Sequence, residues 1–213
     1  TASAVADLLV REGVATPDVA LEAARAAQSH IGLARALARD PQMRERRRAI
    51  ITAPASVRSV GEAVMAADRL LETAKAQADA QVSERNAREK AELLRQLGMD
   101  EGESATKASR TMIRQLEEDQ KRRSKRALTD AIDRALIDLL AIYRDVLMVQ
   151  VGGDGELINT DLSDLVHQIA LDSTPRQTLA RVDHIETARK RLVSNGNPLL
   201  VLEDMAISLR PQA

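Results

Sequence analysis

The stretch without proline or glycine that decides the fold covers residues 104–151. It reads SATKASRTMIRQLEEDQKRRSKRALTDAIDRALIDLLAIYRDVLMVQV. Strong helix formers dominate it, and from Leu128 on its apolar residues recur at spacings of three and four, as on one face of a helix. We therefore predict one long helix with a buried face in its second half. That face carries Leu128, Ile132, Leu136, Leu139, Tyr143 and Val146.

A second stretch without proline, residues 57–97, precedes the first and has Gly61 as its only interior glycine. The loop GMDEGES between the two stretches centres near Glu101. We therefore predict an antiparallel helical hairpin, in which residue 74 lies opposite residue 128.

Large apolar residues are sparse between residues 75 and 127 of this hairpin. Because two helices with few apolar side chains bury little surface, we expect this part to project as a thin, polar coiled-coil arm. Residues 75–97 would give the arm a length of about 35 Å.

Short helices are predicted before the hairpin, within residues 1–40, from proline and capping signals. So small a bundle would be only marginally stable alone. Pro54 is expected to break the chain and Ser56 to cap the helix that follows. The expected short helices cover residues 2–12, 17–28 and 31–39.

The end of the chain is predicted to add three more helices, whose apolar faces pack on the base of the hairpin. Leu179 and Ile185 are expected on one of these buried faces. No segment shows the alternation of a β-strand, so the predicted fold class is all-α. The expected helices cover residues 161–171, 175–194 and 198–209.

The composition excludes several kinds of site. The 213 residues include 31 Lys+Arg against 32 Asp+Glu, for a formal net charge of -1, which leaves room for only a local basic patch. Disulfides and thiolate metal sites are excluded because cysteine is absent. Tyr143 is the only aromatic residue, so stacking of single-stranded bases is nearly excluded. His30 lies beside an apolar stripe and is interpreted as structural.

The sequence offers no motif for catalysis or for a cofactor. No nucleophile stands in a recognisable arrangement with a base, and no phosphate-binding G-x-x-x-x-G-K-[ST] motif occurs. The glycine-rich residues 152–155 follow a helix and are interpreted as a flexible connector. Asp154, Glu156, Asn159 and Asp161 lack the spacing of a calcium loop. We expect no catalytic residue, no metal and no cofactor, and the absence of apolar spans and of a leader favours a cytoplasmic protein without membrane contact.

Two basic clusters leave two interpretations open. Each could be a solvated helix face with ion pairs such as Glu118–Arg122, or it could contact the phosphates of DNA or an acidic partner surface. The first cluster is Arg44, Arg46, Arg47 and Arg48. The second is Lys121, Arg122, Arg123, Lys125 and Arg126.

Three stretches together resemble one family. They are AARAAQSHIGLARALARD at 23–40, LEEDQKRRSKRALTDAIDRALIDLLAIYRDVLMVQ at 116–150 and RKRLVSNGNPLLVLEDMAISL at 189–209. In this order they are similar to the C-terminal half of the delta-prime subunit of the bacterial DNA polymerase III clamp loader. The middle stretch, with its basic run and long arm, resembles the actinobacterial form.

The resemblance implies an accessory, non-ATPase subunit of the polymerase III holoenzyme, which helps to load the sliding clamp onto primed DNA during replication. Residues 1–40 would be an AAA+ lid-like bundle, and residues 41–213 the collar domain with an arm at about 75–127. The AAA+ module would precede Thr1. The collar would bind the gamma/tau and delta subunits, and ATP and magnesium are expected on other subunits of the complex.

Two details of the resemblance concern particular residues. ATP-binding clamp-loader subunits carry a lid motif similar to G-S-x-R-D-A-L, and Gly32 stands where its arginine would reach the nucleotide. The last helix matches the collar signature of the family. The resemblance implies a subunit interface there, formed by Asn197, Pro198, Glu203 and Arg210.

Two other classes of protein remain as alternatives. Residues 16–39 could form a helix-turn-helix of a DNA-binding regulator, with the hairpin as its dimerisation element. Its recognition helix would offer few base-reading side chains, chiefly Arg35 and Arg39. The chain could also be a generic coiled-coil adaptor.

Overall fold

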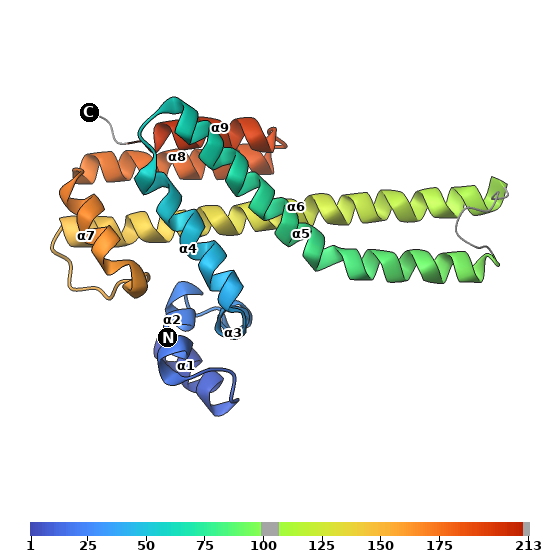
Figure 1. Cartoon of the computed structure of the whole chain (residues 1–213), viewed down its shortest axis with the longest axis horizontal. Coiled ribbons are helices and arrows are strands. Elements are labelled where there is room, and N and C mark those ends of the chain that lie inside the picture. Colours follow the sequence, from blue (N-terminus) through green and yellow to red (C-terminus); the bar gives the residue numbers. More distant parts are fainter. Residues whose placement is uncertain (99–106, 211–213) are drawn as a thin grey trace. The chain divides into compact units, whose positions relative to one another are not determined.

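The computed structural model describes residues 1–98 and 107–210. Helices are the only regular elements in these two ranges, and no strand occurs there, so the predicted all-α class is confirmed. The chain divides into two compact units, one made of Thr1–Leu70 with Arg134–Ala213 and the other of Leu71–Asp133 (Figure 1). The predicted loop around Glu101 lies almost entirely outside the described residues.

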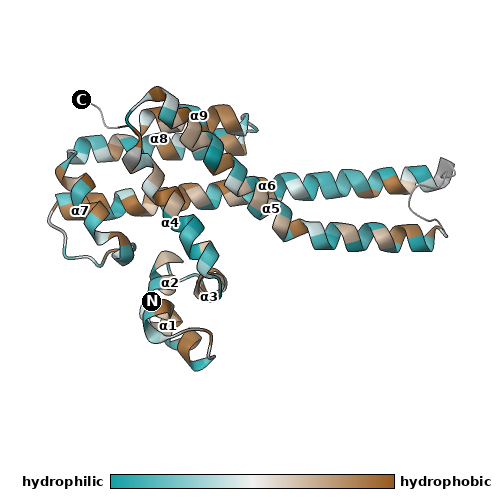
Figure 2. Ribbon diagram, viewed as in Figure 1, coloured by the Kyte–Doolittle hydropathy of each residue, from teal (hydrophilic) through white to brown (hydrophobic). Residues whose placement is uncertain are grey.

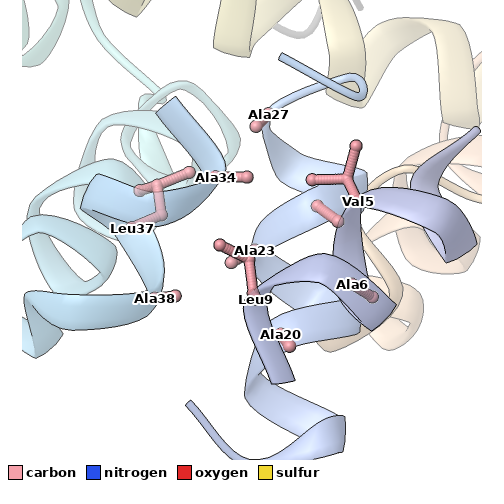
Figure 3. Packing of buried hydrophobic residues seen from close by; sticks show 10 residues of the cluster. Val5, Ala6, Leu9, Ala20, Ala23, Ala27, Ala34, Leu37 and Ala38 are labelled. Atoms are coloured by element: carbon pink, nitrogen blue, oxygen red, sulfur yellow. The ribbon is translucent and has the colours of Figure 1, made fainter. Parts of the chain in front are cut away.

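The first three helices form a small bundle with its own core (Figure 3). They are α1 (Ala2–Arg11), α2 (Pro17–Ala26) and α3 (Ile31–Arg39), close to the predicted ranges. Alanines make up most of this core, with Leu9 and Leu37 as its largest buried side chains. His30 is the N-cap residue of α3. Its Nδ1 accepts a hydrogen bond from the backbone N–H of Leu33 at 3.1 Å. The structural interpretation of His30 is therefore confirmed.

Helix α4 (Pro41–Ser56) begins where Asp40 caps it and continues through Pro54. The prediction that Pro54 breaks the chain is wrong, because the proline lies in the last turn and the helix ends only two residues later.

Helix α5 (Val60–Gln96) is capped by Ser59, so the prediction that Ser56 caps this helix is wrong. The Ser59 hydroxyl accepts from the N–H of Glu62 at 3.1 Å, and the Glu62 carboxylate accepts from the N–H of Ser59 at 3.1 Å. This reciprocal pair is a capping box. The hydrogen bonds from the N–H groups of Arg58 and Ser59 lower the pKa of Glu62.

The rest of the first unit contains the second half of α6 (Lys107–Gln150), a 3-10 turn at Thr160–Leu162, α7 (Ser163–Leu171), α8 (Pro175–Val193) and α9 (Pro198–Ser208). The predicted buried face of α6 is confirmed from Ile132 to Val146. Leu179, predicted to be buried on α8, is 49% exposed. The buried face of α8 instead carries Thr178, Arg181, Ile185 and Ala188.

The segment after α6 is held in place by Asp145, which is fully buried. Its carboxylate accepts from the N–H of Ile158 at 3.0 Å and from the N–H of Asn159 at 2.8 Å. Gly153 and Gly155 pack closely against the end of the Met148 side chain. A Cβ atom added at Gly153 would lie 2.7 Å from Met148 Cε, and one added at Gly155 would lie 2.6 Å from it, so neither position has room for a side chain unless Met148 moves. Residues 152–155 are interpreted from the sequence as a flexible connector, but the segment packs on α6 at two places. Gly153 and Gly155 contact Met148, and residues 158 and 159 bond to Asp145.

The unit Leu71–Asp133 contains the adjoining parts of α5 and α6, which run antiparallel (Figure 1). Ala78, Val82 and Ala127 form a small apolar cluster, against which Leu128 packs. Figure 2 shows mainly hydrophilic residues along α6 in this unit. This apolar cluster therefore holds the two helices together over only part of their length.

Candidate functional site

The basic segment, which we define as Lys121–Arg126, lies on α6 within the unit Leu71–Asp133. At 100° per residue its five cations spread over about 200°, a little more than half of the helix circumference. Lys121, Arg122, Lys125 and Arg126 are exposed, whereas only 25% of the Arg123 side chain is exposed. The five cations therefore have different roles.

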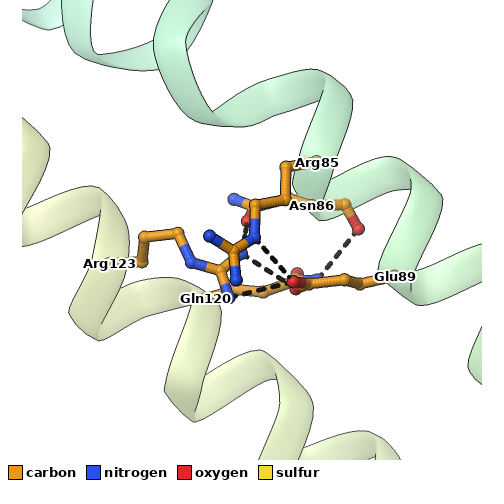
Figure 4. Close-up of polar contacts among 5 residues, drawn as sticks. All are labelled: Arg85, Asn86, Glu89, Gln120 and Arg123. Carbon is orange, nitrogen blue, oxygen red and sulfur yellow. Dashed lines mark hydrogen bonds and ion pairs between the residues drawn. The ribbon is translucent and has the colours of Figure 1, made fainter.

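Arg123 lies at the centre of a polar layer between α6 and α5 (Figure 4). Its Nη1 donates to Asn86 Oδ1 at 2.6 Å and to Glu89 Oε2 at 2.8 Å, and its Nη2 donates to Glu89 Oε1 at 3.1 Å. Arg85 donates to the same carboxylate at 2.8 Å, and Gln120 donates to the backbone carbonyl of Asn86 at 2.9 Å. The layer supplies cross-helix contacts where large apolar residues are scarce.

The two arginines determine the protonation of Glu89. Hydrogen bonds from Arg123 and then from Arg85 stabilise the carboxylate and lower its pKa to about 2. Glu89 is therefore ionised throughout the neutral range.

The polar layer also fixes the register of the hairpin. A loop centred at Glu101 would place Asn86 opposite residue 116. Asn86 instead bonds Gln120 and Arg123, four and seven positions further along α6, so α6 is displaced by one to two helical turns from the predicted register.

The exposed cations divide into paired and unpaired groups. Arg122 forms an ion pair with Asp119 instead of the expected pair with Glu118. Glu118 accepts from Arg114 at 3.1 Å. Lys125 also has an interaction partner. Within the described part of the chain, Lys121 and Arg126 have no ion-pair partner. These two side chains are the ones available to an external anion.

The other basic cluster, at the start of α4, is engaged within the chain. Each of its four arginines contacts a carbonyl or a side chain of the same unit, which favours pairing within the chain over contact with DNA phosphates or an acidic partner, although Arg47 is buried rather than on a solvated face. Arg44 donates to Leu37 O at 2.6 Å, Arg46 to Asp40 at 3.2 Å, Arg47 to Asp138 at 2.9 Å and to Asn159 at 2.5 Å, and Arg48 lies 3.7 Å from Asp161.

The Arg47–Asp138 pair is almost completely buried, with 10% and 12% of the two side chains exposed. Burial raises the pKa of Asp138, although Arg47 beside it opposes this shift. Loss of either partner would leave a buried charge without compensation, so the pair links α4 to α6 structurally.

The four residues of the predicted subunit interface all lie at or near α9. Asn197 caps the helix, since its Oδ1 accepts from the N–H of Leu199 at 3.0 Å, and Pro198 occupies the first turn. Arg210 donates to the carbonyl of Ile207 at 3.0 Å at the other end. Glu203 is half-buried, with no hydrogen bond or ion pair within the described residues. The structure thus gives Asn197, Pro198 and Arg210 roles at the helix ends, whereas Glu203 has no polar partner among the residues that the structure describes.

Sequence reasoning missed the polar partners of these side chains. Glu89 and Asn86 were not singled out, because their importance depends on the register of α6. Arg181 was also missed, although its spacing from Thr178 and Ile185 places it on the buried face of α8. No group of three or more His, Cys, Asp or Glu residues in the described ranges is arranged to hold a metal ion.

Comparison with known proteins gives one match to a curated protein. Over 72 residues, which are 34% of this chain, the sequence is 39% identical to DNA polymerase III subunit delta' of Bacillus subtilis (strain 168). The match covers 22% of that relative, so the chain spans about a fifth of its length. No family model matches the chain, and no solved structure matches it.

The chain therefore contains a region related to a clamp-loader delta' subunit. The resemblance is confirmed to that extent, and the helix-turn-helix alternative is not favoured. The actinobacterial type and the assignment to the C-terminal half stay predictions. Every helix in residues 1–98 and 107–210 is too short or too polar to cross a lipid bilayer.

Proposed function

We propose that this protein acts as a non-ATPase, delta-prime-type subunit of a bacterial clamp loader. The observation that carries the proposal is the 39% identity over 72 residues to a delta' subunit. In this role the chain contributes structure to an assembly that loads the sliding clamp onto primed DNA. ATP and magnesium bind other subunits, and the protein works in the cytoplasm as part of the replisome.

The sequence and local structure support a role without nucleotide chemistry. Gly32 lies in the first turn of α3, at the position of the nucleotide-contacting arginine in the related lid motif. Glycine has no side chain to offer a phosphate. The proposed collar, residues 41–213, supplies the binding surface for gamma/tau and delta, with Glu203 on α9 as its candidate contact.

Reconstitution with purified subunits tests this function. The full chain, mixed with the gamma/tau and delta subunits of the same organism, should elute with them as one stoichiometric complex. Clamp loading onto primed DNA, measured by fluorescence of a labelled clamp, should depend on its presence. Elution of the chain apart from both subunits, as a tight dimer, would favour the regulator alternative and reject the proposal.

A further inference from the structure

A pocket of about 350 Å³ opens between α4, α7, α8 and the residue that follows α9. Its walls are partly apolar, with Pro54 on α4, Leu165 on α7 and Leu209 after α9. Its charged groups are Arg58, Asp172 and Arg181. All of these residues belong to the first unit, Thr1–Leu70 with Arg134–Ala213.

Arg181 is the unusual residue of this pocket. It is only 8% exposed, and no other residue in the described ranges forms a hydrogen bond or an ion pair with its guanidinium. The guanidinium lies over the ring of Tyr143, whose centroid is 5.8 Å from Arg181 Cζ. A mostly buried cation without a hydrogen-bonding partner is unfavourable, because the protein replaces little of the water that the cation loses, and a ligand in the pocket could supply the missing acceptors.

Tyr143, Thr178 and Gln150 do not provide a counter-charge, and Asp172, a carboxylate that lines the pocket, forms no ion pair with Arg181 within the described residues. Burial raises the pKa of Tyr143 to about 12, so its hydroxyl is neutral at physiological pH. Thr178 donates to Gln150 at 2.9 Å, and Gln150 in turn donates to the carbonyl of Ser173 at 2.7 Å. These polar groups satisfy one another, and Arg181 lines the pocket without a hydrogen bond to any described residue.

We propose that the pocket at Arg181 is a binding site for a carboxylate carried on a short apolar stem. The planar guanidinium matches the two oxygens of a carboxylate. Arg58 already donates to the carbonyl of Ala55 at 2.6 Å, so it adds positive charge to the pocket but has fewer free donors.

The charge balance favours a carboxylate over a phosphate. Arg58 and Arg181 together with Asp172 give the pocket a net charge of about +1 on simple counting, which a monoanion neutralises. A doubly charged phosphate would leave an excess negative charge next to Asp172. Pro54, Leu165 and Leu209 offer apolar surface to the stem of the ligand.

Titration of the full chain with sodium butyrate tests the proposal. The Nε–H signal of Arg181, followed by ¹H–¹⁵N NMR at constant ionic strength, should shift and saturate at millimolar butyrate. Arg176, an exposed arginine on the same helix, is the matched control and should not shift. Arg181→Gln should weaken binding at least tenfold, and Arg181→Lys should weaken it less, because lysine keeps the charge but not the planar pair of donors.

Two further titrations identify the ligand. N-acetylglutamate N-methylamide mimics an acidic side chain of a protein partner, so binding as tight as that of butyrate would assign the site to a protein carboxylate. Binding of butyrate alone would assign it to a free organic acid. Tighter binding of inorganic phosphate, or no saturable shift with any probe, would overturn the proposal. If Arg181→Gln does not fold, the wild-type titration and a rise of Tm with butyrate still decide the question.

Discussion

Arg123 on α6 and Glu89 on α5 form a two-point ion pair, with Nη1 2.8 Å from Oε2 and Nη2 3.1 Å from Oε1. Both side chains are mostly buried, with 25% of Arg123 and 30% of Glu89 exposed. The pair lies in a part of the hairpin with few large apolar side chains. A cation of the basic segment thus has a structural role between the two helices.

Arg123→Ala should lower the free energy of local opening in the hairpin by roughly 1 kcal/mol, the upper end for partly exposed ion pairs. Native-state amide exchange of residues 80–98 and 110–127 measures this effect. Arg122→Ala is the matched control, because Arg122 pairs with Asp119 on the surface of the same helix. Equal effects of the two substitutions would contradict the cross-helix role of Arg123.

The Glu89 pair should make the hairpin sensitive to acid. The pKa of Glu89 is about 2 in the folded chain and about 4.3 when unfolded. Its contribution to stability is therefore complete above the unfolded value and is lost as the pH falls through about 2. NMR titration of the Glu89 carboxyl carbon should give a low midpoint, which rises in Arg123→Ala. A midpoint that is the same in both proteins would show that Arg123 does not stabilise the carboxylate.

Lys121 and Arg126 are the best candidates for a contact with DNA phosphates. Replacing both with alanine should weaken binding of the assembled clamp loader to primed DNA. The slope of log affinity against log salt should flatten by up to about 2, one for each lost phosphate contact. Arg123 is kept intact in this test because its loss would disturb the hairpin itself. An unchanged slope in a fully assembled complex would exclude these two residues from DNA binding.

Two leucines of α9 should differ strongly in their contribution to stability. Leu202 is fully buried, whereas Leu200 is 63% exposed. Leu202→Ala should therefore lower the free energy of unfolding by about 2–5 kcal/mol, and Leu200→Ala should change it by less than about 0.5 kcal/mol. Chemical denaturation followed by circular dichroism compares them directly. Similar losses from both substitutions would mean that Leu200 is also buried in solution.

Glu203 should affect assembly more than folding. Glu203→Lys changes a half-buried side chain that has no hydrogen bond or ion pair within the described residues. We expect weaker co-elution with gamma/tau and delta, with a nearly unchanged Tm. Arg210→Glu is the comparison variant, and it should lower Tm because it loses the bond to Ile207 and places a negative charge at the end of α9. A fall in Tm with Glu203→Lys would assign a structural role to Glu203.

Local chemistry made the helices and most of their ends predictable from the sequence. Asp40-Pro41, Thr174-Pro175 and Asn197-Pro198 each combine a capping side chain with a proline in the first turn, and a helix begins at each one. Spacing of three and four along α6 likewise predicted its buried face from Ile132 to Val146. These features depend on residues within one or two helical turns, which the sequence places next to each other.

Only the tertiary structure decided the partners of the charged residues. The five cations of the basic segment look equivalent in the sequence, yet Arg123 alone faces Asn86 and Glu89, because the register of α6 against α5 depends on side-chain packing across the hairpin. Arg181 resembles any other arginine of α8 until neighbouring helices cover it. Whether a charge is solvated, paired or buried depends on groups that are distant in the chain, and their positions are fixed by packing rather than by local sequence.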